Sequence, residues 1–120
     1  MSQIDVMFDL ETLGISTDSV VLSIGAVVFN REGLGKEFYV ELNPEQPARK
    51  IDINTIKWWL QQGLPIPILG QYDIKDGFGD FFSFVLEESL VANTDNIAIG
   101  HRKVNLWCNG TDFDWGITRT

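Results

Sequence analysis

The sequence predicts one α/β domain, with an antiparallel three-strand meander at the N-terminus, flanking helices and a mixed sheet. Apolar and polar residues alternate over residues 4–11, which is the period of a strand with one buried face. A β-branched run at residues 20–30 and a second alternation at residues 36–42 follow, separated by turn residues. Two later segments repeat their apolar residues with the period of a helix instead.

The three N-terminal strands differ in how they are covered. The first strand, residues 4–11, has two faces, one with Ile4, Val6, Phe8 and Leu10, and the other with Asp5, Met7, Asp9 and Glu11. The second, Val20–Asn30, reads VVLSIGAVVFN, which is typical of a strand covered on both faces. A hairpin turn at residues 31–35 leads to the third strand, Lys36–Leu42.

Helices are expected in the second half of the chain. Asp52 or Asn54 can cap a short helix that ends before Gly63. In Asp76–Glu88, apolar residues lie at i, i+3, i+4, i+7 and i+8, so this helix should pack on the sheet. Val104–Cys108 is a predicted fourth strand, and the turn at residues 109–112 is expected to open another helix.

The composition is that of a folded protein. The 120 residues are 44% hydrophobic, enough for one domain spanning residues 1–120. No run of eighteen apolar residues and no secretory signal is present, so we expect a cytoplasmic protein without a membrane partner. The net charge of −8 argues against a general polyanion-binding surface. Carboxylates that hold divalent cations still meet phosphate through the metal, so a nucleic-acid substrate is not excluded.

Two carboxylates close the first strand, in the stretch FDLETLG. Asp9 and Glu11 lie two residues apart and therefore project to the same face of the strand. Hard divalent ions such as Mg²⁺ or Mn²⁺ prefer oxygen ligands of this kind, completed by water and substrate phosphate. The alternative is that a strand entering a loop simply becomes polar at its end.

A second group of acids follows the fourth strand, in the stretch WCNGTDFD. Asp112 is also explained as a helix cap. Asp114, one turn into the expected helix, is also explained as an acid favoured by the dipole of that helix. Neither acid alone indicates a site.

Four segments together resemble a known family. The stretches DLETLG, VVLSIGAVVFN, INTIKWWLQQ and LWCNGTDFDWGI occur in this order across nearly the whole chain. They resemble the DEDD (DnaQ-like) superfamily of 3′→5′ exonucleases, within the branch of phage exonuclease A and the Rv2179c-like exoribonucleases. The resemblance implies an RNase H-like fold, a mixed sheet that opens with an antiparallel meander and is flanked by helices.

The resemblance also implies roles for particular residues. Asp9 and Glu11 match the first two acids of the family's first motif, and Asp114 matches the acid of its second motif. These three would hold two Mg²⁺ or Mn²⁺ ions, which hydrolyse the terminal phosphodiester of a single-stranded DNA or RNA 3′ end and release mononucleotides. Thr12 and Leu13 border the terminal nucleotide in such enzymes, and Asn109 lies where they hold the substrate end.

The paired tryptophans of the predicted short helix allow two interpretations. Trp58 can stack on a base, a contact that tolerates any sequence. A tryptophan at helical spacing also covers core, and this explains Trp59 better than Trp58.

The chain departs from the family after the second motif. The family's third motif supplies a His or Tyr base and a fourth acid, but residues 115–120 contain neither. The one histidine, His101, precedes the second motif and is expected to be an exposed loop residue. We therefore expect an incomplete fold with little or no activity from this chain alone.

Three hypotheses follow from this departure. The chain is a metal-dependent exonuclease, or a non-catalytic remnant that binds nucleic acid or metal or acts as an assembly module. A structural protein with no nucleotide connection is the third. An incomplete sheet would also favour homo-oligomers.

Overall fold

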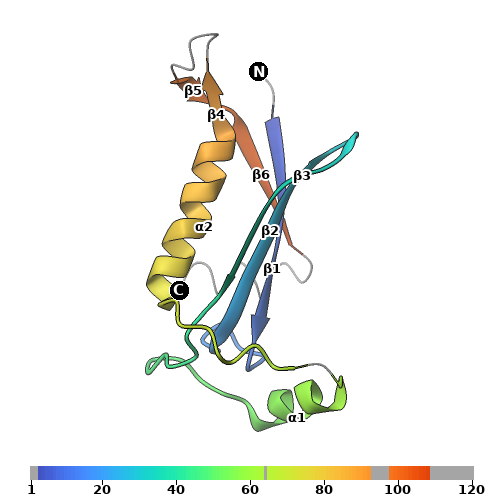
Figure 1. Ribbon diagram of the computed structural model, residues 1–120, viewed down its shortest axis with the longest axis vertical. Coiled ribbons are helices and arrows are strands. Elements are labelled where there is room, and N and C mark those ends of the chain that lie inside the picture. The colour runs from blue at the N-terminus through green and yellow to red at the C-terminus, as the bar shows by residue number, and fades with distance from the viewer. Residues whose placement is uncertain (1–2, 64, 93–97, 109–120) are drawn as a thin grey trace.

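The computed structural model describes residues 3–63, 65–92 and 98–108. A four-stranded sheet has the order β3-β2-β1-β6, and β4 and β5 form a separate two-stranded ribbon (Figure 1). The elements are β1 (Gln3–Thr12), β2 (Val21–Asn30), β3 (Gly33–Glu41), α1 (Ile53–Gln61), α2 (Ile74–Ser89), β4 (Leu90–Ala92), β5 (Ala98–His101) and β6 (Lys103–Cys108). The sheet is mixed, because β1 pairs antiparallel with β2 and parallel with β6.

The predicted meander is confirmed; its ends shift by one residue at most, except at the start of the third strand. β3 begins at Gly33 rather than Lys36, because Asn30 pairs directly with Gly33 and leaves a two-residue turn between the strands. Gly33 has φ +135°, a conformation that residues with a side chain rarely adopt. Near the other end of the meander, the β1–β2 register shifts between Glu11 and Thr12.

The main core lies between one face of the sheet and α2. The alternating apolar residues of β1 are buried there, as predicted, and Phe8 meets Phe81 of α2 with ring centroids 5.5 Å apart. α2 begins at Ile74 rather than Asp76, because Asp73 accepts a hydrogen bond from the Lys75 backbone N–H and caps the helix. α2 covers one face of the sheet and leaves the other to the polar residues of β1 (Figure 1).

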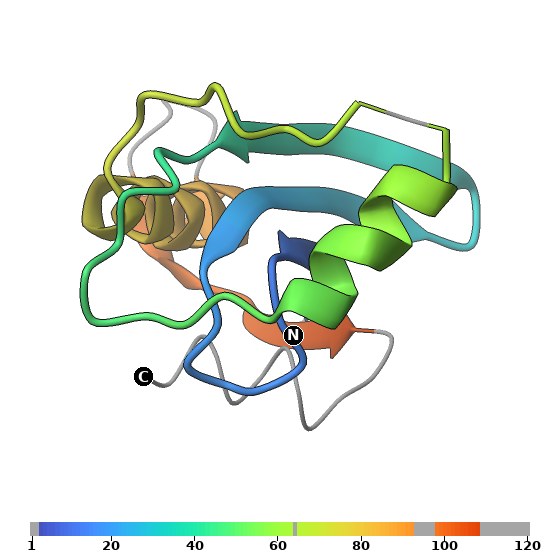
Figure 2. The same cartoon turned by 90° about the horizontal axis from the view of Figure 1, so that it is seen from below.

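A second, smaller core joins α1 to the end of β1. Its buried members are Leu13, Val20, Leu22 and Trp59. Figure 2 shows α1 lying across the end of the sheet, on the side where β1 ends. Of the two candidate caps, Asp52 is the one used, and its side chain accepts from the backbone N–H of Asn54.

The β4–β5 ribbon was not predicted, because its strands have three and four residues and lack the length of a clear alternation. His101 lies in β5 and not in a loop. The predicted fourth strand is confirmed as β6. Among the described helices, neither is long and apolar enough to cross a membrane.

Candidate active site

Asp9 and Glu11 lie on the sheet face that α2 does not cover. Phe8 precedes the two acids, and Leu10 lies between them. Both apolar side chains are buried in the core, so the strand period turns both carboxylates to the opposite face. The β1–β6 register ends with Phe8 opposite Cys108. The described part of β6 therefore stops one residue short of the level of Asp9.

Residues of β2 and β3 lie beside the two carboxylates on the same face of the sheet. Asp9 is opposite Gly25 of β2, and Glu11 is opposite Ser23. Gly25 has no side chain, so the space beside Asp9 stays open as far as the ring of Tyr39 on β3. The Tyr39 hydroxyl donates to Glu41 Oε2 at 2.9 Å. Burial and the nearby charges of Glu41 and Glu11 raise the pKa of Tyr39.

The surroundings of both carboxylates disfavour their ionised form. Partial burial raises the pKa of Asp9, partly offset by a hydrogen bond from the Leu10 backbone. Burial also raises the pKa of Glu11, and the charge of Asp9 raises it further. The only ion pair among the described residues joins Lys50 to Asp18, so no basic side chain within that part of the chain neutralises the pair.

A bound divalent cation would relieve this electrostatic cost. Two half-buried carboxylates that repel each other gain most from a shared cation. No set of three His, Cys, Asp or Glu residues that could hold a metal is present among the described residues. The pair alone would supply only part of the coordination shell of such a cation. Asp114, the third acid expected from the sequence, lies outside the described residues, as does Asn109.

A cleft of about 460 Å³ opens beside Glu11. One wall is the end of β1, with Glu11 and Thr12, and the other is α1, with Asn54, Thr55 and Trp58. The cavity is large enough for one nucleotide and has an aromatic wall opposite a carboxylate wall.

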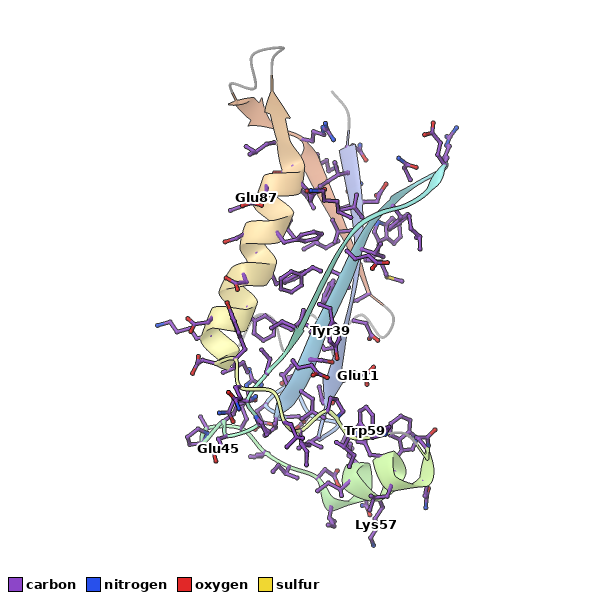
Figure 3. All side chains as sticks on the ribbon, viewed as in Figure 1. Glu11, Tyr39, Glu45, Lys57, Trp59 and Glu87 are labelled. Carbon is purple, nitrogen blue, oxygen red and sulfur yellow. The ribbon has the colours of Figure 1, made fainter. Side chains whose placement is uncertain are left out.

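The two tryptophans of α1 differ in exposure and in contacts. Trp59 is 8% exposed, and its indole Nε1 donates to the Thr12 carbonyl oxygen at 3.0 Å (Figure 3). Trp58 is 51% exposed and lines the cleft. The two rings meet edge to face, with centroids 5.4 Å apart. Trp59 thus fixes the helix to the strand that carries the carboxylates and holds Trp58 at the mouth of the cleft.

Thr12 and Leu13 lie at the cleft in different ways. Thr12 lines it, but its hydroxyl is buried and donates to the Gly14 carbonyl oxygen at 2.9 Å. The Leu13 side chain packs in the second core beside Trp59 and does not line the cleft. Leu13 therefore shapes the site through its backbone, which donates to Val20 O and accepts from Asp52 N.

Several residues of the site were not singled out from the sequence. Tyr39 and Glu41 reach the carboxylate face only because β3 pairs with β2 in this register. Asn54 and Thr55 line the cleft because α1 docks against β1. The alternation of KEFYVEL, which places Tyr39 and Glu41 on one face of their strand, is the one signal that would have pointed to the first two.

Comparison with known proteins finds a matching family model. The family model of the Rv2179c-like 3′-5′ exoribonuclease domain matches residues 4–120. No curated protein sequence matches the chain significantly.

Solved structures of exonuclease I are similar to the chain. Escherichia coli exonuclease I in complex with a dT13 oligonucleotide aligns with a TM-score of 0.62 and 15% identity, over 98% of this chain and 23% of that one. Exonuclease I from Methylocaldum szegediense aligns with a TM-score of 0.62 and 13% identity, over 98% and 23% of the two chains. The chain spans about a quarter of the length of these proteins.

At such identities the likeness shows the fold, which is the RNase H-like α/β fold of these exonucleases. The family match covers nearly the whole chain, including the strand with Asp9 and Glu11 and the helix with Trp58. The chain belongs to the Rv2179c-like 3′-5′ exoribonuclease domain family.

Proposed function

We propose that this chain is the metal-binding and nucleotide-binding part of a 3′→5′ exonuclease that acts on single-stranded nucleic acid. The observation that carries the proposal is the carboxylate pair of Asp9 and Glu11 on one strand face, with Glu11 and Trp58 both lining a cleft of about 460 Å³. The family match supports the reaction class. The matched family is described as an exoribonuclease domain, which favours RNA as the substrate.

The donor set fits divalent metal ions. Asp9 and Glu11 would bind them, with Asp114 as a third ligand by resemblance to the family. Such ions, when bound, activate water for attack on a phosphodiester and stabilise the oxygen that leaves. The partial burial that raises the pKa of both carboxylates favours binding of a cation over solvation by water.

The remaining residues act on the substrate. Trp58 presents an exposed indole on which the terminal base stacks, a contact worth about 1–3 kcal/mol per base. Trp59 positions both walls, since its hydrogen bond to the Thr12 carbonyl ties α1 to the residue next to Glu11. Tyr39 and Glu41 form a hydrogen-bonded pair on the same face as Asp9.

Cleavage assays test the proposal directly. A 5′-labelled single-stranded RNA and the matching DNA are incubated with the full chain and Mn²⁺. Weak stepwise shortening from the 3′ end is expected, since residues 115–120 supply neither the base nor the fourth acid of the family's third motif, and it should disappear in Asp9→Asn and Asp114→Asn.

A control variant separates the site from its surroundings. Asp5→Asn removes a carboxylate from the same strand and the same face, where it accepts hydrogen bonds from Asn105 and Trp107, and it should retain activity. Loss of activity in Asp5→Asn as well would show that the charge of the face matters and that the pair has no special role.

The non-catalytic alternative has support from the same sheet face. Met7, Tyr39 and Trp107 expose large side chains there, an area that a second copy of the chain would cover. As an assembly module, the chain would form a dimer by light scattering that Trp107→Ser disrupts, and it would bind Mn²⁺ or RNA without shortening the strand.

A further inference from the structure

Ser23 is the one residue with a polar side chain in the apolar run of residues 20–29. It is 2% exposed, although it lies on the sheet face that α2 leaves uncovered. Burying a hydroxyl group costs free energy unless the group is hydrogen-bonded. A buried serine on this face therefore needs an acceptor close to it.

Strand register places Ser23 between two carboxylates. It is directly opposite Glu11 of β1 on one side and Glu41 of β3 on the other. Residues opposite each other in an antiparallel pair lie on the same face, with Cβ atoms about 4.5–5.5 Å apart. The register shift between Glu11 and Thr12 makes Glu11 and Ser23 the last pair before the irregularity. Ser23 is therefore the cross-strand neighbour of Glu11.

The Tyr39 hydroxyl lies near the same three residues. It donates to Glu41 Oε2 at 2.9 Å, so its own proton is already used. Burial and the charges of Glu41 and Glu11 raise the pKa of Tyr39. A hydrogen bond with Ser23 opposes this rise in the Tyr39 pKa. The Ser23 hydroxyl consequently has two acceptors in its surroundings, the Tyr39 oxygen and the Glu11 carboxylate.

The Glu11 carboxylate is the stronger of these two acceptors. Hydrogen bonds to an ionised group are about twice as strong as those between neutral groups. Carboxylates that bind metal ions are themselves hydrogen-bonded by neighbouring groups, which fix their orientation. We propose that Ser23 is a positioning residue, whose hydroxyl donates to the Glu11 carboxylate and holds it in the orientation that binds a divalent cation. This inference rests on the proposed function, which assigns the cation to Glu11.

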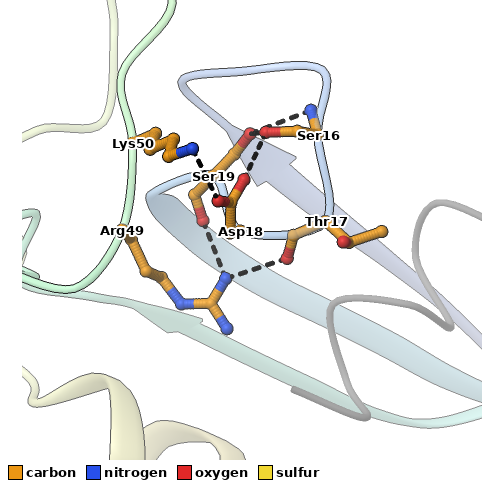
Figure 4. A network of polar contacts seen from close by, with 6 residues as sticks. All are labelled: Ser16, Thr17, Asp18, Ser19, Arg49 and Lys50. Carbon is orange, nitrogen blue, oxygen red and sulfur yellow. Dashed lines mark hydrogen bonds and ion pairs between the residues drawn. The ribbon is translucent and has the colours of Figure 1, made fainter.

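A second buried serine, Ser19, has a different environment. It is 1% exposed, and its Oγ accepts from the Ser16 backbone N–H at 3.1 Å (Figure 4). The guanidinium of Arg49 donates to the carbonyl oxygens of Thr17 and Ser19, at 3.1 and 3.0 Å. Ser19 therefore belongs to the hydrogen bonds of its own loop, whereas the polar groups around Ser23 belong to the carboxylate face.

Calorimetric titration of the full chain with Mn²⁺ tests the positioning role. Ser23→Ala should weaken Mn²⁺ binding about tenfold, the lower end of the loss expected when a metal ligand loses its hydrogen-bonding partner. Ser23→Thr keeps a hydroxyl on the strand and should retain the affinity. Urea unfolding of both variants, compared with the unmodified chain, separates an effect on Glu11 from an effect on the fold.

Two further variants serve as controls. Ser19→Ala also removes a buried serine hydroxyl, but one that is bonded within its loop. It should lower the urea midpoint and leave the Mn²⁺ affinity unchanged. Tyr39→Phe removes the competing acceptor of the Ser23 proton, so its Mn²⁺ affinity should equal or exceed that of the unmodified chain.

The outcomes separate this inference from the proposed function. If Glu11→Gln loses Mn²⁺ binding but Ser23→Ala binds Mn²⁺ as tightly as the unmodified chain, the positioning role is overturned and the proposed function stands. If Tyr39→Phe loses as much affinity as Ser23→Ala, the tyrosine orients Glu11 and the inference is also overturned. The same holds if Ser19→Ala weakens Mn²⁺ binding as much as Ser23→Ala, since the loss then follows the fold. If the unmodified chain binds no Mn²⁺, both proposals fall.

Discussion

Replacing Trp59 with phenylalanine removes the hydrogen bond that joins α1 to the end of β1. The indole Nε1 donates to the Thr12 carbonyl oxygen at 3.0 Å, and both groups are buried. The ring packs with Leu13, Val20 and Leu22 in the second core. Phenylalanine keeps an aromatic ring at this position but has no donor, so the Thr12 carbonyl is left buried without this partner.

The magnitude follows from two terms. A buried carbonyl that loses its donor costs about 1–3 kcal/mol, and the smaller ring leaves a void that costs about 1 kcal/mol more. We expect Trp59→Phe to lower the free energy of unfolding by about 2–4 kcal/mol, a large part of the usual total of about 5–15 kcal/mol. Trp58→Phe is the control, since its half-exposed ring should change stability by less than about 0.5 kcal/mol.

Two measurements check the prediction. Urea unfolding followed by far-ultraviolet circular dichroism avoids the change in tryptophan fluorescence that the substitutions themselves cause. Calorimetric titration with Mn²⁺ tests the site, because Thr12 directly follows Glu11 and the register shift lies between them. Trp59→Phe should weaken Mn²⁺ binding several-fold, and Trp58→Phe should weaken only nucleotide binding.

One result would refute the reasoning. If Trp59→Phe and Trp58→Phe unfold at the same urea concentration and bind Mn²⁺ equally well, the indole hydrogen bond does not position the strand end. The cleft would then depend on the apolar contacts of the second core alone.

The other predictions concern charge, a buried amide and two glycines. Because burial raises the pKa of Asp9, its charge disfavours the folded state at neutral pH, and this cost fades as the pH falls through the folded-state pKa. Asp9→Asn should therefore melt at a higher temperature than the unmodified chain at pH 7 without metal, with the gap closing toward pH 3 by calorimetry. A lower melting temperature at pH 7 would contradict this. Gln46→Ala should cost about 2–3 kcal/mol in urea unfolding, because the buried amide pairs with both Val21 N and Val21 O. Gly79→Ala should stabilise α2 by about 0.5–1 kcal/mol, since nothing lies near its added Cβ. Gly70→Ala should destabilise, since its Cβ would lie 2.6 Å from the Glu41 carbonyl carbon; equal melting temperatures for the two alanine variants would be contrary evidence.

Local patterns in the sequence were sufficient to predict the main elements. The alternation in β1 placed Asp9 and Glu11 on one face, and the structure puts Phe8 and Leu10 on the other. The helical period of α2 placed Phe81 and Val85 in the core, where they lie, but Phe82 and Leu86, which the same period placed on the packing face, are exposed. These predictions hold because side chains in a strand and in a helix each repeat with a fixed period, so the buried face can be predicted from the local order of residues.

Boundaries and short elements depended on contacts that the local pattern does not contain. α2 begins two residues earlier than predicted because the Asp73 side chain caps it. β3 begins earlier because Gly33 pairs directly with Asn30. The β4–β5 ribbon is too short to show a period, and it exists because two distant strands pair with each other.

The sequence by itself determined which residue types were available for the site: two acids two residues apart and a pair of tryptophans on one helix. Only the tertiary structure decided that Glu11 and the two tryptophans share a cleft, because α1 docks on the end of β1 through the second core and through a hydrogen bond between Trp59 and Thr12, 47 positions apart. The same is true of Tyr39, which strand register brings to the carboxylate face. Such contacts join residues whose separation along the chain carries no period, so local order cannot specify them.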